Sequence, residues 1–174
     1  MQLPPGETHL DRPLEIPPHA KNLTLHGHPT GSTLVMDPGF QGSAAIIVKG
    51  AFNVTISGFA IRGNRTELKS DWYLPEHYEQ FADFYSANGL VVRGSDRVVV
   101  RGVTLTSIRA FPILINASSR VLIESVDIRD CGTLNRAGRN NTTGGILLEE
   151  GVAAFQIRHA NVSRIPCLLY KVSN

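Results

Sequence analysis

The sequence predicts an all-β solenoid, a rod built from short strands that stack coil upon coil. The first observation is a recurring six-residue phrase with apolar residues at its second and fourth positions, as in "NVTISG" and "RVVVRG". Such alternation is typical of a strand with one buried face. The second observation is that a short apolar segment precedes each phrase. The phrase starts at residues 22, 53, 97, 120 and 154.

The repeating unit contains three strands. The strands that precede the phrases are expected at 13–16, 45–48, 89–92, 112–115, 145–148 and 167–170. A third short strand follows most phrases, at 59–61, 103–105, 126–128 and 160–162. A sharp bend separates the second strand from the third, at Gly27, Gly58, Gly102, Ser125 and His159. A bend with positive φ favours Gly, so His159 departs from the pattern.

The shortest unit has 23 residues, and the longer ones carry their excess in one loop. Only 75–87 has apolar residues at helical spacing.

Composition excludes several classes of protein. The formal charge is only +2 and no block of Lys and Arg occurs, which argues against nucleic-acid binding. No apolar run approaches the roughly 18 residues that a membrane span needs. No signal peptide is apparent, because Met1 is followed directly by "QLPPGE". The two cysteines, Cys131 and Cys167, are too few for a disulfide scaffold; buried thiols are favoured, and a single bridge stays an alternative.

The stretches "LPPGETHLDRPLEI" and "NGLVVRGSDRVVVRGVTL" resemble coils of right-handed parallel β-helix proteins of the pectate-lyase-like superfamily. The resemblance covers essentially the whole chain. It implies a single domain over 1–174 with about six coils, three strands per coil and a long loop at 63–88. It implies no particular activity, because this fold carries lyases, hydrolases, epimerases and proteins without known activity.

Both ends of the predicted solenoid differ from the family pattern. Members usually begin with an amphipathic capping helix, and none precedes Leu3. The last segment, "CLLYKVSN", stops in the turn before a further strand. Uncapped coils expose unpaired backbone groups. We therefore expect a partial solenoid whose open ends are covered by a neighbouring domain or a second copy.

Alternation places two columns of residues on the outer face of the first strands. The first column is Glu15, Ile47, Val91, Leu114, Leu147 and Leu169. The second is Pro17, Lys49, Arg93, Asn116, Glu149 and Lys171. The resemblance implies that this face is the floor of a substrate groove. The apolar first column needs cover, from the 64–88 loop, a partner chain or missing terminal segments.

Motifs of the best-known enzymes of the superfamily are missing. In pectin hydrolases the phrase resembles "DGIDI" with a catalytic outward Asp, whereas this chain has "NGLVV" with Val91 at that position. The calcium-binding Asp set and the Arg-x-Pro-x-x-Arg pattern of pectate lyases are absent, as is the Asp-Pro-His-Asp motif of alginate epimerases. No cofactor is therefore expected; Ca²⁺ is the alternative, although no ligand set for it can be identified.

The second column contains candidates for binding an anionic polymer. Lys49, Arg93 and Lys171 are spaced along the axis to meet successive negative groups, and the Arg fork binds carboxylates bidentately. The alternative is that the charged side chains of this column are simply solvated and keep the face soluble, without binding a ligand. Asn116 and Glu149 belong to the same column, and Arg109 is expected at the lip of the groove.

The long loop supplies the remaining candidates. Trp72, Tyr73 and Tyr78 could stack on sugar rings. His77 or Tyr78 could remove the C5 proton of a uronic acid while Arg93 neutralises its carboxylate. The alternative is that the aromatic residues pack as a lid on the apolar column. A hydrolase would need two facing carboxylates, from Glu149 with Asp130, Asp71 or Glu76.

These observations together favour an extracytoplasmic protein, whether secreted, periplasmic or on the cell surface, that binds an anionic polysaccharide. If it is an enzyme, β-elimination is favoured over hydrolysis. The alternative is a non-catalytic structural or interaction module of a larger protein, in which the apolar column docks a partner.

Overall fold

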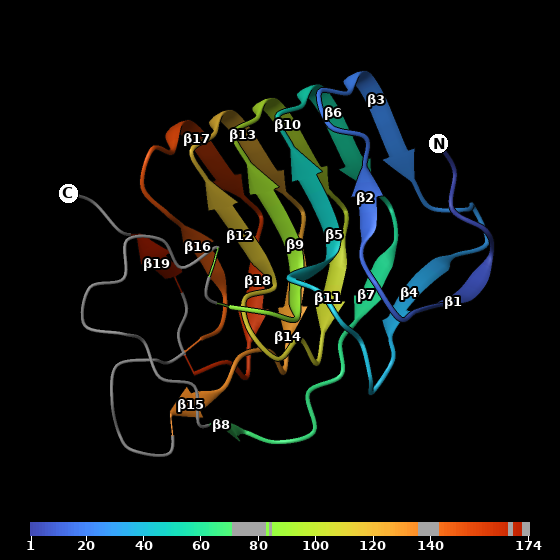
Figure 1. The fold of residues 1–174 in the computed structure, drawn as a ribbon, viewed down its shortest axis with the longest axis vertical. Helices are drawn as coiled ribbons and strands as arrows, with labels where there is room; N and C mark the ends of the chain where they lie inside the picture. Colours follow the sequence, from blue (N-terminus) through green and yellow to red (C-terminus); the bar gives the residue numbers. More distant parts are fainter. Residues whose placement is uncertain (71–82, 84, 136–142, 167–168, 172–174) are drawn as a thin grey trace.

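The chain is a parallel β-helix with three strands in each coil (Figure 1). The computed structural model describes residues 1–70, 83, 85–135, 143–166 and 169–171, which contain nineteen strands. Three sheets run along the molecule, and all their strand pairs are parallel. We name them the leading, middle and trailing sheets, after the order of their strands within a coil.

The leading sheet consists of β2 (Leu14–Ile16), β5 (Ala44–Lys49), β9 (Asn88–Arg93), β12 (Ile113–Asn116), β16 (Ile146–Leu148) and β19 (Leu169–Lys171). The middle sheet consists of β3 (Lys21–His26), β6 (Phe52–Ser57), β10 (Asp96–Arg101), β13 (Ser119–Glu124) and β17 (Ala153–Arg158). The trailing sheet consists of β1 (Gly6–Leu10), β4 (Ser32–Met36), β7 (Ala60–Arg62), β11 (Thr104–Thr106), β14 (Asp127–Arg129) and β18 (Asn161–Ser163).

The predicted fold class is confirmed, and the strands lie where the repeat placed them. The sequence pattern missed β1 and β4, the trailing strands at the beginning of the chain. The segment between Gly27 and Ser32 separates β4 from its phrase, so β4 does not follow the bend directly. The candidate helix at 75–87 lies mostly outside the described residues.

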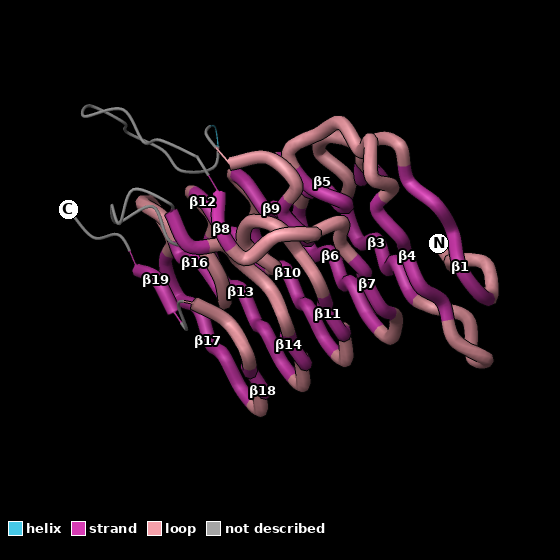
Figure 2. The backbone as a smooth tube through the Cα atoms, turned by 90° about the horizontal axis from the view of Figure 1, so that it is seen from below, coloured by secondary structure: helices cyan, strands magenta, loops and turns pink. Residues whose placement is uncertain are grey.

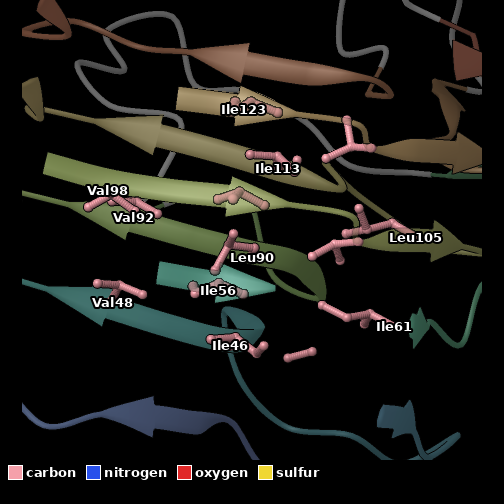
Figure 3. Close-up of a cluster of buried hydrophobic side chains, with 14 of the residues drawn as sticks. Ile46, Val48, Ile56, Ile61, Leu90, Val92, Val98, Leu105, Ile113 and Ile123 are labelled. Carbon is pink, nitrogen blue, oxygen red and sulfur yellow. The ribbon is translucent and has the colours of Figure 1, made fainter. Parts of the chain in front are cut away.

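One apolar core runs along the inside of the three sheets (Figure 3). The strand register places similar residues above one another. Ile46 pairs with Leu90 and Leu90 pairs with Ile113, and all three are buried. The aliphatic side chains of the middle and trailing strands, such as Val98 and Leu105, close the core from the other sides. Strand stacking satisfies the backbone of each coil, so each coil depends on its neighbours.

The bends between middle and trailing strands have left-handed backbone at Gly58, Gly102, Ser125 and His159. His159, with φ of 49°, therefore adopts the conformation that the pattern requires, despite its side chain. Gly27 is different, because its φ is not positive. A Cβ there would lie 2.0 Å from the carbonyl oxygen of Gly58, so the glycine permits a close approach of two coils.

The register of the last strand differs from the prediction by one residue. Lys171 pairs with Leu148 and Leu169 pairs with Ile146, whereas the sequence pattern aligned Lys171 with Glu149. Successive residues of a strand point to opposite faces, so a register is fixed by a clean alternation of apolar and polar residues. "CLLYK" has adjacent apolar residues and offers no such alternation.

Two loops on the trailing side are joined by a small parallel sheet. Its strands are β8 (Lys69–Ser70) and β15 (Leu134–Asn135), which lie side by side below the coils (Figure 1). Arg65 reinforces the link by donating to the carbonyl oxygen of Gly132 over 2.9 Å. Viewed from below, the trailing strands β4, β7, β11, β14 and β18 follow one another along the coil stack (Figure 2).

Candidate functional site

A pocket of about 360 Å³ lies on the outer face of the leading sheet, across β2, β5 and β9. Its floor is the part of the first column formed by Ile47 and Val91. The residues that line it are Glu15, Ile16, Pro18, Ser43, Ile47, Lys49, Asp83, Val91 and Arg93. The pocket therefore lies on the face that the sequence analysis assigned to ligand binding, but it spans three strands of the six.

Two cations and two carboxylates surround the apolar floor. Lys49 and Arg93 are register partners on β5 and β9, so they occupy adjacent positions in the second column. The Arg93 guanidinium binds both carboxylate oxygens of Asp83, one of them at 3.2 Å, in a fork-to-fork ion pair. About a third of the Arg93 side chain stays exposed, at 35%. Arg93 is thus held in a fixed orientation at the edge of the pocket.

Farther along the leading sheet, the outer face is covered by the chain itself. A second apolar cluster forms there from Tyr85, Ala110 and Phe111, which pack on Val91, Leu114 and Leu147. The rings of Tyr85 and Phe111 meet edge to face with centroids 5.2 Å apart. Leu114 and Leu147 are fully buried as a result. The cover that the apolar column needs comes from within this chain.

Asn88 fixes the chain segments that provide this cover. Its side-chain amide donates to the carbonyl oxygens of Ser43 and Tyr85, over 2.8 and 2.9 Å. Its side-chain oxygen accepts from the backbone N–H of Phe111 at 3.0 Å. Asn88 is completely buried, so these bonds replace the water that its amide would otherwise bind. One side chain therefore holds both aromatic residues of the cover in place.

Asn116 and Glu149 follow Arg93 along the second column, but both are buried. They are 1% and 2% exposed, and the Asn116 amide donates to the Glu149 carboxylate over 2.8 Å. The side-chain oxygen of Asn116 has no hydrogen-bond partner among the residues that the structure describes. The alternation rule placed these residues on the outer face, and it contained no information about what covers that face.

The structure places the other predicted site residues as follows. Arg109 is exposed and does not line the pocket. Lys171 lies on β19 beside Leu148. Asp130, considered as a carboxylate partner of Glu149, pairs with Arg164 at 2.7 Å instead. The four candidates in the long loop, Trp72, Tyr73, His77 and Tyr78, lie outside the described residues.

Sequence reasoning did not assign a role to Glu15, Ser43 or Asp83. Glu15 belongs to the first column, two strands before Val91. This position indicated that Glu15 lies on the same outer face as Val91. Asp83 lies ten residues before Arg93 within the long loop, and no periodic pattern there indicates that it returns to the Arg93 side chain.

No group of three His, Cys, Asp or Glu side chains that could hold a metal ion occurs among the described residues. Likewise, no helix within the described part of the chain is long and apolar enough to cross a membrane.

The fold resembles a solved structure. One match is the crystal structure of a "putative glycosyl hydrolase" from Parabacteroides merdae, with a TM-score of 0.67. The match covers 98% of this chain and 74% of that chain, at 17% sequence identity. A likeness at this identity concerns the fold. No protein-family model matches the sequence, and no curated protein sequence matches it.

Proposed function

We propose that the pocket on β2, β5 and β9 binds an acidic saccharide. The observation that carries the proposal is the pairing of two adjacent cations, Lys49 and Arg93, with an apolar floor in one pocket. Cationic groups bind uronic carboxylates, and apolar surface packs against the C–H faces of sugar rings. A carbohydrate-related protein of the same fold supports the choice of ligand class. With such a ligand, a location outside the cytoplasm is part of the proposal, whether the protein is secreted, periplasmic or on the cell surface.

β-Elimination is the reaction that we propose if the protein is an enzyme. Arg93 would exchange its ion pair with Asp83 for the uronic carboxylate and so stabilise the charge that develops when the C5 proton leaves. The base would be His77 or Tyr78, both outside the described residues. Trp72 and Tyr73 stay proposed ring-stacking residues. The pocket also contains Glu15 and Asp83, and paired carboxylates are what hydrolysis requires.

The interaction-module alternative rested on an exposed apolar column that docks a partner. Leu114 and Leu147 are buried by Tyr85, Ala110 and Phe111 of the same chain, so that part of the column is not available to a partner. The pocket therefore supports saccharide binding better. A neighbouring domain or a second copy at the open coil ends stays a separate proposal.

Binding and turnover test the proposal. Oligosaccharides of galacturonate, alginate and hyaluronan are titrated by calorimetry, with neutral cello-oligosaccharides as the comparison. We expect binding of at least one acidic series, and Arg93→Ala or Lys49→Ala should weaken it by about tenfold or more. Ultraviolet absorbance detects unsaturated products of a lyase, and reducing-end assays detect hydrolysis.

Arg101→Ala is the matched control, because Arg101 is also an exposed arginine in an ion pair, with Glu124 on the middle sheet. This variant should bind as the parent protein does. No binding of any acidic series by the parent protein would overturn the proposal, and equal weakening by Arg101→Ala would show that the effect is not specific to the pocket.

A further inference from the structure

The outer face of the leading sheet changes character between β9 and β12. On β2, β5 and β9 it borders the pocket, with Glu15 and Lys49 exposed and Arg93 at the edge, while Val91 on β9 is already buried. On β12 and β16 it is filled, since Leu114 and Leu147 have no exposed surface. Both columns change together, because Asn116 and Glu149 are buried as well. The transition therefore takes place within one strand spacing, at Val91 on β9 in the first column and at Asn116 on β12 in the second.

The material that fills the face forms a wall next to one end of the pocket, over Val91; its rings are themselves buried and do not line the pocket. Phe111 and Tyr85 pack edge to face over the first column. Asn88 pins the backbone of both residues and is itself completely buried. A wall anchored by two buried hydrogen bonds is part of the folded core, and a ligand cannot push it aside without breaking them.

The open part of the face is short. It spans three neighbouring strands, so its length along the axis is two strand spacings, roughly 10 Å. That is about the length of a disaccharide. An extended polymer that lay along the sheet past Arg93 would collide with the aromatic wall, so only the end of a chain fits in this orientation.

From this geometry we infer that the pocket recognises the end of an acidic saccharide chain, with the terminal sugar at Val91, next to the Tyr85–Phe111 wall, and Arg93 beside it. The inference rests on the proposed function and adds the ligand's form: a chain end or a disaccharide, and no internal segment of a polymer. Arg93 is placed to meet the terminal carboxylate because β9 is the last open strand before the wall. Lys49, one strand away, is placed to meet the next sugar.

A length series tests this inference. Galacturonate and alginate oligomers of two, three, four and six sugars are titrated by calorimetry, with affinity expressed per chain. We expect the affinity to reach its full value at two or three sugars and to change by about twofold or less beyond that length. One protein should bind per chain, whatever the length. Arg93→Ala should weaken binding of all lengths by the same factor.

Each outcome has a distinct meaning. A hexamer that binds about tenfold or more tightly than the trimer would overturn the inference while the proposed function stands, because only an open groove gains from added sugars. Several proteins bound along one hexamer would overturn it in the same way. No binding at any length overturns the proposed function and this inference with it.

Discussion

At the scale of single residues, Cys131 shows how burial controls a titratable group. The thiol is completely buried, and its sulfur lies 3.1 Å from the carbonyl oxygen of Arg129. Burial raises the pKa of Cys131 to about 12, from an ordinary value of 9.0. The thiolate would lose its hydration inside the core, so the protonated form is strongly favoured there.

This shift predicts that stability falls at high pH. In the unfolded chain the thiol ionises from about pH 9, whereas in the folded chain it keeps its proton to about pH 12. The folded state therefore binds more protons in this interval, and ionisation stabilises the unfolded state. The free energy of unfolding should fall by up to about 1.4 kcal/mol per pH unit above pH 9 from this group alone.

Urea unfolding between pH 8 and pH 11 measures the effect. Other groups titrate in this range, so the informative quantity is the difference in slope between the parent protein and Cys131→Ala. Both should carry Cys167→Ser, so that a second thiol does not contribute. The slope of the Cys131→Ala protein should be shallower, and equal slopes would contradict the assignment.

At the scale of elements, the cover over the leading sheet depends on Asn88. Asn88→Ala removes two donors and one acceptor from a completely buried site. The carbonyl oxygens of Ser43 and Tyr85 and the N–H of Phe111 would lose their partner. We expect the free energy of unfolding to fall by about 3 kcal/mol. Urea unfolding measures it, and loss of saccharide binding would show that the wall has moved.

Asn161→Ala is the control for this prediction. Asn161 is exposed and donates to Asp127 over 3.3 Å, so its loss should cost about 0.5 kcal/mol or less. A similar cost for the two variants would mean that Asn88 does not anchor the cover.

The elements differ in how far the sequence could predict them. Repeated phrases such as "RVVVRG" alternate apolar and polar residues and end in a bend. These two features correctly predicted the strands and the residues that point into the core. The cover was not predictable in the same way. Phe111 and Tyr85 lie in irregular segments whose positions depend on tertiary hydrogen bonds to Asn88, and no period in the sequence encodes them.

The same limit applies to the residues around the pocket. Lys49 and Arg93 were placed on the outer face because they lie on strands, where alternation fixes the face. Asn116 and Glu149 were placed there by the same rule, but their burial depends on the covering segments. Asp83 was not found, because its approach to Arg93 is a loop contact.

At the scale of the whole molecule, each coil contacts mainly the coils before and after it. The strands of the middle sheet show this arrangement: β13 lies between β10 and β17, whereas β17 has one neighbour in the sheet. Burial follows the same gradient. Ile123 on β13 is 1% exposed, whereas its register partner Ile157 on β17 is only partly buried. Stability in such an array depends on nearest-neighbour interfaces.

The two isoleucines therefore form a matched pair for a test of this gradient. Ile123→Ala leaves a cavity between two coils and should lower the free energy of unfolding by about 3 to 4 kcal/mol. Ile157→Ala removes the same atoms from a position with one covering coil, and it should cost about half as much. Urea unfolding compares them, and native-state amide exchange should show β17 opening before β10 and β13. Equal costs, together with equal protection of β17 and β10, would show that the coils unfold as one unit, because the gradient in burial would then have no energetic counterpart.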